Sequence, residues 1–182
     1  MNPLKKEYYT FDEWLSWDED VRAELCDGTL IMMAPPSQKH QRLLSELHGQ
    51  LWQFLKGTSC KVFPAPFGVR LNEYEDTVFE PDIVVICDKS KLDGKIFSGA
   101  PDLVVEILSP STARMDRGVK YRKYQQAGVR EYWIIDPELN LLQTAILSDG
   151  KYISSVYEET DIAPVSVLEG CEINLTEVFN EE

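Results

Sequence analysis

The sequence has 182 residues, of which 43% are hydrophobic and 27% are charged, and its formal net charge is −13. Such a composition is typical of a globular protein, and this length favours a single domain, which we expect to span residues 1–182. The excess of acidic residues argues against broad electrostatic adhesion to nucleic acid, because neutralising phosphates requires Lys and Arg. It does not exclude a locally basic cleft.

The cysteines and the apolar runs bear on the compartment of the protein. Its four cysteines are far apart, form no CxxC pair and accompany only two histidines, which excludes a finger or ribbon zinc site. We expect all four to be reduced thiols. No apolar run is long enough to span a bilayer, and no apolar signal region follows the first residues. We therefore expect a cytoplasmic protein without a membrane partner.

The first third of the chain predicts a short helix and a hairpin. Thr10 and Glu13 have the spacing of a capping box, which predicts a short helix through Trp14 and Trp17. Asp27-Gly28 lies between two apolar stretches, and both residue types tolerate the positive φ angles of a tight turn. Residues 23–33 are therefore predicted to form an N-terminal β-hairpin.

A long amphipathic helix and a second hairpin are predicted next. Leucines, together with Phe54, recur with helical spacing over residues 38–56, and Ser37 is a suitable N-cap. Residues 61–63 and 67–71 are expected to pair with each other around a proline-rich turn.

The middle of the chain predicts buried strands. Residues 81–86 and 101–108 are nearly continuous apolar runs, as in strands covered on both faces. A helix is expected over residues 113–127, with Gly128 as its C-terminal stop. The strand over residues 131–137, reached by this helical crossover, should run parallel to its neighbour.

The C-terminal part completes the predicted fold. Residues 141–147 and 152–157 resemble an antiparallel pair, and a short amphipathic segment surrounds Val178. The expected fold class is therefore mixed α/β, with a mixed central sheet flanked by helices.

Two acidic residues in the apolar strands carry the chemistry. Glu106 interrupts an otherwise apolar run, and an ionised carboxylate buried there costs several kcal/mol unless something compensates its charge. Asp102 and Glu106 are four strand residues, or roughly 13 Å, apart, which is too far for one ion. Asp82 on a neighbouring strand, only about 4.8 Å away, is the better partner. Two carboxylates with water suit Mg²⁺ or Mn²⁺.

These residues resemble the PD-(D/E)XK nuclease superfamily, and within it a family of Uma type described as restriction endonucleases. The resemblance spans roughly residues 8–136. The matching motifs are Leu25-Cys26-Asp27-Gly28, Met33-Ala34-Pro35-Pro36-Ser37 with His40, Glu80-Pro81-Asp82, the segment from Leu103 to Thr112, Lys120 with Tyr124, and the segment from Gly128 to Trp133. It implies a restriction-endonuclease-like core.

The resemblance also implies roles for single residues. Asp82 and Glu106 would be metal ligands. The superfamily lysine stands two residues after the glutamate, where this chain has Leu108, and the branch moves it to the following helix, where Lys120 matches. Asp82, Glu106 and Lys120 are thus the expected catalytic residues. The expected accessory residues are Glu24, Glu80, His40 and Tyr124.

Each of these residues also has a simpler structural interpretation. Glu106 could pair with an arginine, and Asp82 could be a solvated residue at a strand start. Lys120 could form an ordinary helix pair with Asp116, four residues earlier. Tyr124 could belong to the core. Glu24 could be a surface charge of the hairpin, and His40 a solvent-facing residue at a helix start.

Three functions follow from the sequence. The first is a Mg²⁺-dependent endonuclease that hydrolyses DNA phosphodiesters by metal-activated water, as a homodimer if two strands are cut. The second is an inactive nuclease fold that serves as a binding or assembly module. The third is a metal phosphodiesterase acting on RNA or a small nucleotide, which suits an acidic protein better than duplex DNA does.

Overall fold

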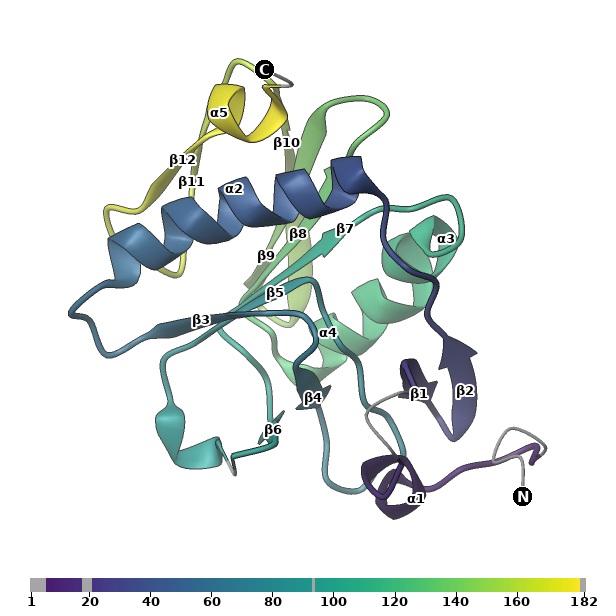
Figure 1. Cartoon of the computed structure of the whole chain (residues 1–182). Coiled ribbons are helices and arrows are strands. Elements are labelled where there is room, and N and C mark those ends of the chain that lie inside the picture. The colour runs from purple at the N-terminus through teal and green to yellow at the C-terminus, as the bar shows by residue number, and fades with distance from the viewer. Residues whose placement is uncertain (1–5, 18–20, 93, 181–182) are drawn as a thin grey trace.

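A six-stranded mixed sheet forms the centre of the structure, a computed structural model that describes residues 6–17, 21–92 and 94–180 (Figure 1). The strand order is β10-β9-β8-β7-β5-β3. Strands β7 and β8 are parallel, and the other neighbours are antiparallel. The bounds are β3 Lys61–Pro64, β5 Ile83–Ile86, β7 Leu103–Ile107, β8 Glu131–Asp136, β9 Leu141–Ser148 and β10 Lys151–Glu158. This confirms the mixed sheet and the parallel crossover.

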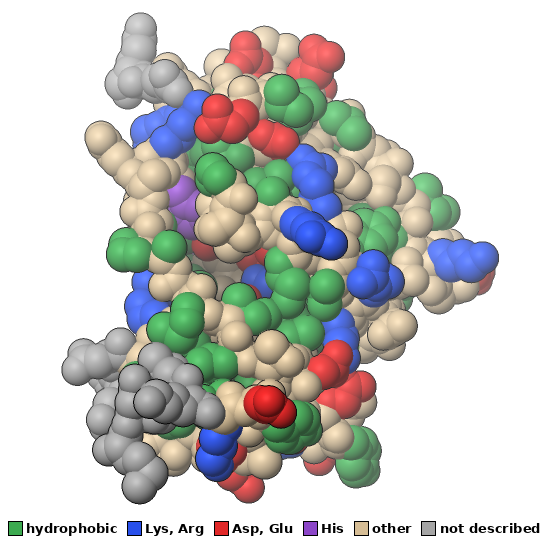
Figure 2. Space-filling model, turned by 90° about the vertical axis from the view of Figure 1, so that its right-hand side faces the viewer, with side chains coloured by type: hydrophobic (Ala, Val, Ile, Leu, Met, Phe, Trp, Pro, Cys, Tyr) green, Lys and Arg blue, Asp and Glu red, His purple; other side chains and the backbone are tan. Residues whose placement is uncertain are grey.

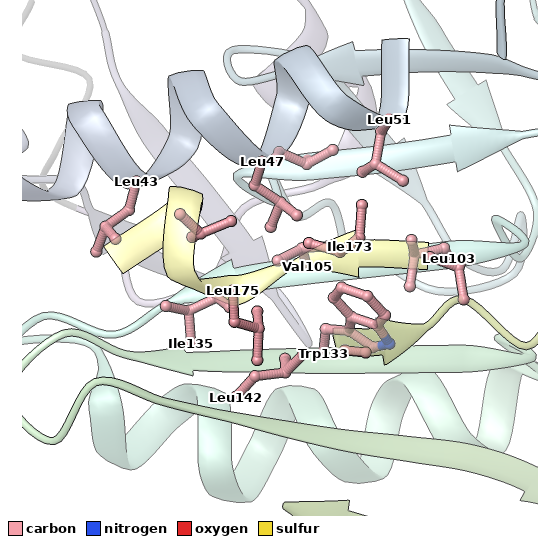
Figure 3. Packing of buried hydrophobic residues seen from close by; sticks show 14 of the residues in the cluster. Leu43, Leu47, Leu51, Leu103, Val105, Trp133, Ile135, Leu142, Ile173 and Leu175 are labelled. Atoms are coloured by element: carbon pink, nitrogen blue, oxygen red, sulfur yellow. The ribbon is translucent and has the colours of Figure 1, made fainter. Parts of the chain in front are cut away.

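One face of the sheet is covered by the long helix α2 (Gln38–Leu55), which begins at the N-cap Ser37 as predicted. The helix α5 (Leu175–Phe179) and the pair β11 (Ile162–Pro164) and β12 (Glu172–Asn174) lie beside α2 (Figure 1). Figure 3 shows Leu43, Leu47 and Leu51 of α2 above Val105 and Trp133 of the sheet. Full burial of such side chains stabilises the fold by about 1.5–3 kcal/mol each.

The other face is covered by the crossover between β7 and β8. The sequence predicted one helix over residues 113–127. The structure has α3 (Ala113–Met115), a π-helical segment η3 (Asp116–Lys120) and α4 (Tyr121–Ala127). The crossover ends at Gly128, whose φ of 87° gives the predicted left-handed stop. Single π turns in helices often occur at functional sites, and this one buries both Asp116 and Lys120.

The N-terminal capping box and hairpin are confirmed, but the helix ends at Leu15 and does not reach Trp17. Thr10 and Glu13 form the capping box of α1 (Phe11–Leu15), and β1 (Ala23–Cys26) pairs with β2 (Thr29–Met32) around the predicted turn. Strand β1 also bridges to the segment that precedes β5, with Leu25 opposite Val78. This bridge brings the hairpin to the end of the central sheet.

The second predicted hairpin is wrong. Strand β3 pairs with β5, whereas β4 (Gly68–Arg70) pairs in parallel with β6 (Ile96–Ser98) in a separate two-stranded sheet, near the short helix η2 (Lys89–Lys91). Two neighbouring apolar runs indicate strands, but the pattern does not say which partner each strand takes.

The prediction of four reduced cysteines is also wrong for two of them. Cys60 and Cys87 form a disulfide, while Cys26 and Cys171 are free and buried. The antiparallel register pairs Lys61 with Ile86, so the next residues outward, Cys60 and Cys87, face each other. That proximity depends on a register between segments 27 residues apart.

Among the described residues, no helix is both long enough and apolar enough to cross a membrane. The expectation of no signal peptide concerns a segment that includes residues 1–5, which lie outside the described residues. The assignment of residues 1–182 to one domain stays a prediction.

Candidate active site at the ends of the central strands

Asp82 and Glu106 come together at the ends of two adjacent strands. Ile83 pairs with Val105 in the antiparallel register of β5 and β7. One residue further, the same register places Asp82 opposite Glu106, where directly opposed side chains share a face of the sheet. Asp82 lies just before β5, and its Oδ2 accepts a hydrogen bond of 2.7 Å from the N–H of Ile107 in β7. The two segments therefore stay in contact beyond the end of the strand pair.

Glu106 lies in a buried ionic cluster that we define as Glu24, Glu106, Asp116 and Lys120. Lys120 Nζ lies 2.9 Å from Glu106 Oε1, 2.8 Å from Glu24 Oε1 and 3.6 Å from Asp116 Oδ1. The exposed fractions are 4% for Glu24, Glu106 and Lys120 and 1% for Asp116. The charge that compensates Glu106 is therefore a lysine, and Glu24 is not a surface residue.

Hydrogen bonds from uncharged donors also hold the ionic cluster. The Tyr124 hydroxyl donates to Glu106 Oε1 at 2.8 Å, and the Glu80 N–H donates to Glu24 Oε1 at 2.9 Å. Tyr124 is fully buried against Phe79 and Tyr132, so it is both a core residue and a partner of Glu106.

The ionic cluster carries more negative than positive charge. Burial raises the pKa of Glu106 well above its usual value; Lys120 opposes this rise, and Asp116, Asp82 and Glu24 add to it. Burial likewise raises the pKa of Asp116. Burial lowers the pKa of Lys120, but Glu106, Glu24 and Asp116 outweigh that effect, so its pKa is raised and it stays an ammonium. A further cation or proton would balance the remaining carboxylates.

His40 and Glu80 lie beside the ionic cluster. His40 Nε2 is 3.2 Å from Asp82 Oδ2, and its side chain is mostly buried rather than facing solvent. Burial lowers the pKa of His40, but the hydrogen bond and charge of Asp82 raise it above its usual value overall. Burial also raises the pKa of Glu80, whose Oε2 is 4.0 Å from Arg22.

Three buried polar atoms in this region have no hydrogen-bond partner among the described residues: His40 Nδ1, Glu80 Oε2 and Asp116 Oδ1. The last two have only the longer ion-pair contacts to Arg22 and Lys120. Buried polar atoms are nearly always satisfied in folded proteins, because leaving one unpaired costs about 1–3 kcal/mol. All three residues line the same cleft. The cleft therefore has polar positions suited to water, an ion or a ligand.

The cleft has a volume of about 740 Å³, within the usual range for ligand sites. Figure 2 shows the side on which it opens, a hollow with histidine, acidic and basic atoms at its floor and hydrophobic side chains around it. The wall comes from the start of α2, the segment after β7 and the π segment. Its lining includes Asp82, Glu106, Lys120, Glu24, Glu80 and His40.

The donor set fits a hard divalent cation that keeps part of its water shell. Among the residues that the structure describes, no group of three or more His, Cys, Asp or Glu side chains is placed to hold a metal ion. The protein would thus offer the two carboxylates of Asp82 and Glu106. Mg²⁺ is often held by one or two carboxylates plus water and substrate oxygens.

Sequence reasoning missed one member of the ionic cluster. Asp116 was considered only as a helix neighbour of Lys120, and their pair does exist at 3.6 Å. The spacing of Asp116, Lys120 and Tyr124, four residues each, is the signal that could have placed all three on one inward face.

Comparisons with known proteins agree with this architecture. Two proteins of Synechocystis sp., slr1290 and sll1609, are each 28% identical to the chain. The first match covers 82% of this chain and 80% of the relative, and the second covers 70% and 74%. A crystal structure from Anabaena variabilis, titled as a "putative nuclease belonging to DUF820", matches with a TM-score of 0.79 at 23% identity, over 94% of this chain and 97% of that one. The predicted restriction-endonuclease-like fold is confirmed.

A family model described as "Uma2: Putative restriction endonuclease" matches residues 8–176. This range includes both central acids, the π segment and the hairpin that carries Glu24. The match covers far more than half of the sequence. The chain therefore belongs to the Uma2 family.

Proposed function

We propose that this protein is a divalent-metal-dependent nuclease that hydrolyses phosphodiester bonds, with DNA as the first substrate to test. One observation carries the proposal: Asp82 and Glu106 are opposed at the floor of a cleft, with the Lys120 ammonium 2.9 Å from Glu106. Membership of the Uma2 family supports it.

Asp82 and Glu106 would hold Mg²⁺ or Mn²⁺, which when bound lowers the pKa of water and neutralises charge on phosphate oxygens. Lys120 orients Glu106 and presents an ammonium to the charge that develops on the phosphate. Glu24 and Tyr124 keep Lys120 and Glu106 in place through their hydrogen bonds. Of these residues, Asp82, Glu106, Lys120 and Glu24 line the cleft, and Tyr124 supports Glu106 from the core.

The proposal is tested with circular and linear DNA in the presence of Mg²⁺ or Mn²⁺. Asp82→Ala and Glu106→Ala should each reduce cleavage at least about a thousandfold, in line with the loss of groups essential to a transition state. Glu46→Ala, which removes an exposed acid of α2, should cleave like the wild type. Circular dichroism checks that both cleft variants are folded. Unreduced cleavage by both of them would rule the proposal out.

A second substrate class is favoured by the charge of the cleft. Its acidic lining residues are Glu24, Glu80, Asp82, Glu106, Asp116, Asp136 and Glu138, against the cations Arg22, Lys39, Arg117 and Lys120. Duplex DNA gains most of its affinity from basic surfaces. RNA or a small nucleotide phosphodiester is therefore the alternative, and a panel of duplex DNA, single-stranded DNA, RNA and dinucleotides distinguishes the two.

The same charge excess also favours a non-catalytic binding module. Calorimetry with Mn²⁺ separates this module from an enzyme. The nuclease should release or absorb heat on binding Mn²⁺, and Glu106→Gln should abolish that heat. A wild-type protein that gives no heat and no cleavage with any substrate would be the module.

A further inference from the structure

The two edge strands of the central sheet differ in how open they are. Strand β3 has four residues, includes Lys61 and Pro64, and is joined to β5 by the disulfide next to it. Strand β10 has eight residues without proline, and its charged residues lie only at its ends. Ile153 and Val156 in its middle are 63% and 62% exposed. Short strands, prolines and central charges normally prevent an edge from pairing, and β10 lacks all three.

The hydrogen bonds of β10 show which backbone groups face outward. Along an antiparallel strand, the backbone N–H and C=O groups of one residue bond to a given neighbouring strand, and those of the next residue point away from that strand. The Tyr152 N–H donates to the Gln125 side chain, at 2.9 Å, instead of to β9. Ser154, Val156 and Glu158 share this outward orientation, because they follow at steps of two.

Only the middle of this edge is open. The Glu158 N–H donates to the Asp161 side chain at 2.8 Å, so both outer N–H groups of the row are satisfied within the chain. Between them, the N–H groups of Ser154 and Val156 have no acceptor among the described residues. Two free donors are thus bracketed by two satisfied ones, which limits where a partner strand can bond.

We infer that β10 pairs antiparallel with β10 of a second copy of this chain, about a two-fold axis at Ser155. In this register Ser154 lies opposite Val156 of the second copy, and each such pair exchanges two N–H···O=C bonds. Two pairs related by the axis use both free donors of each copy. In a dimer with a two-fold axis, both subunits use the same surface, here the outer edge of β10.

The side chains fit the same register. Lys151 at the start of β10 comes near Glu159 of the second copy, and the contact occurs twice. Glu159 lies in the turn just past the end of its strand, where its Oε2 accepts a hydrogen bond from Asn140. Ile153 comes opposite Tyr157 of the second copy. Opposite charges and aromatic–β-branched pairs stabilise facing strands by roughly 0.2–1 kcal/mol each, whereas parallel pairing of two identical strands would bring like charges together. Charge complementarity therefore favours the antiparallel self-pair.

Sedimentation of the full chain over a concentration series tests the inference. One strand pair buries less than the roughly 1,600 Å² of a standard interface, so we expect a concentration-dependent equilibrium between monomer and dimer. Val156→Pro removes an outward N–H that β9 does not use, and it should shift the mass to that of the monomer. Val156→Ala keeps the N–H and should still dimerise. A wild-type protein that stays monomeric at about 200 µM, far above the roughly micromolar affinity of a weak specific complex, would overturn the inference.

A charge swap tests the pairing without changing the backbone. Lys151→Glu alone and Glu159→Lys alone should each weaken the dimer at low salt, because each places like charges together at both ends of the interface. The double variant Lys151→Glu with Glu159→Lys should restore it. Failure of the double variant to recover, in protein with a wild-type circular dichroism spectrum, would contradict the assigned register.

Cross-linking tests the position of the axis. Directly opposed residues that are not hydrogen-bonded to each other lie about 4.5 Å apart at Cα, which suits a disulfide. Ser155→Cys should therefore cross-link to itself under a mild oxidant, and the control Ser154→Cys should not. Identification of the linked peptides by mass spectrometry separates this bond from those of the native cysteines. Cross-linking of Ser154→Cys alone would place the axis elsewhere and refute the assignment.

Discussion

The two faces of strand β7 present opposite environments. Leu103, Val105 and Ile107 face helix α2 in a large hydrophobic cluster. On the other face, Val104 lies in a second apolar cluster, but Glu106 enters the buried ionic cluster with Lys120. Both faces belong to five consecutive residues of one strand.

This difference separates stability from chemistry within one element. The face under α2 gains stability from burying hydrocarbon, which is non-directional and tolerates exchange of similar side chains. The other face holds three carboxylates around one ammonium, and such a cluster contributes little net stability because desolvation offsets attraction. Because the ionic cluster is costly to bury and lines a cleft, it is better explained by function than by stability. Three substitutions test this difference between the two faces of β7.

The largest effect is expected for Lys120→Met, which removes the only cation of the ionic cluster. Three buried carboxylates then lose their partner, and breaking buried ion pairs typically costs about 3–5 kcal/mol in the free energy of unfolding. We also expect cleavage to fall about a hundredfold or more. Urea denaturation and DNA cleavage measure the two effects. Lys89→Met, which removes an exposed lysine of η2, is the control. A Lys120→Met protein with unchanged activity would remove Lys120 from the proposed site.

A change on the apolar face should separate stability from activity. Leu47→Ala creates a cavity under α2 and should lower the free energy of unfolding by about 2–5 kcal/mol. Activity per folded molecule should remain that of the wild type, because Leu47 does not line the cleft. The check is cleavage at low temperature, normalised to the folded fraction from circular dichroism. A loss of activity larger than the loss of folded protein would mean that the two faces are coupled.

The smallest effect is the contribution of Glu106 to the pH dependence of stability. The pKa of Glu106 is raised in the folded protein, so above the usual value of 4.5 the unfolded chain releases this proton first. The folded state then binds more protons, and stability is lost as the pH rises, by at most about 1.4 kcal/mol per pH unit. Glu106→Gln removes this contribution, so its stability relative to the wild type should increase from pH 5 to pH 8.

Metal addition gives that pH prediction an independent readout. Mg²⁺ binds the ionised carboxylates, so it should raise the melting temperature of the wild type more at pH 8 than at pH 5. It should leave Glu106→Gln unchanged at both. An equal stabilisation of the two proteins would show that the ion binds outside the proposed site.

Patterns local in sequence predicted much of the fold. The capping box at Thr10, the Asp27-Gly28 turn, the helix after Ser37 and the stop at Gly128 depend on neighbouring residues only, and all four are confirmed. The pairing of β3 and the Cys60–Cys87 disulfide were not predicted, because both depend on which distant segments meet.

The sequence by itself determined the apolar strands, the helices around them and the acids that interrupt the apolar pattern. Periodicity expresses this information, because it records which face of each element is buried. Only the tertiary structure decided that Lys120, with Glu24 from the hairpin, compensates Glu106, and that Asp116 joins them. Charges interact through space over a few ångströms, and contacts between residues up to 96 positions apart leave no periodic trace in the chain.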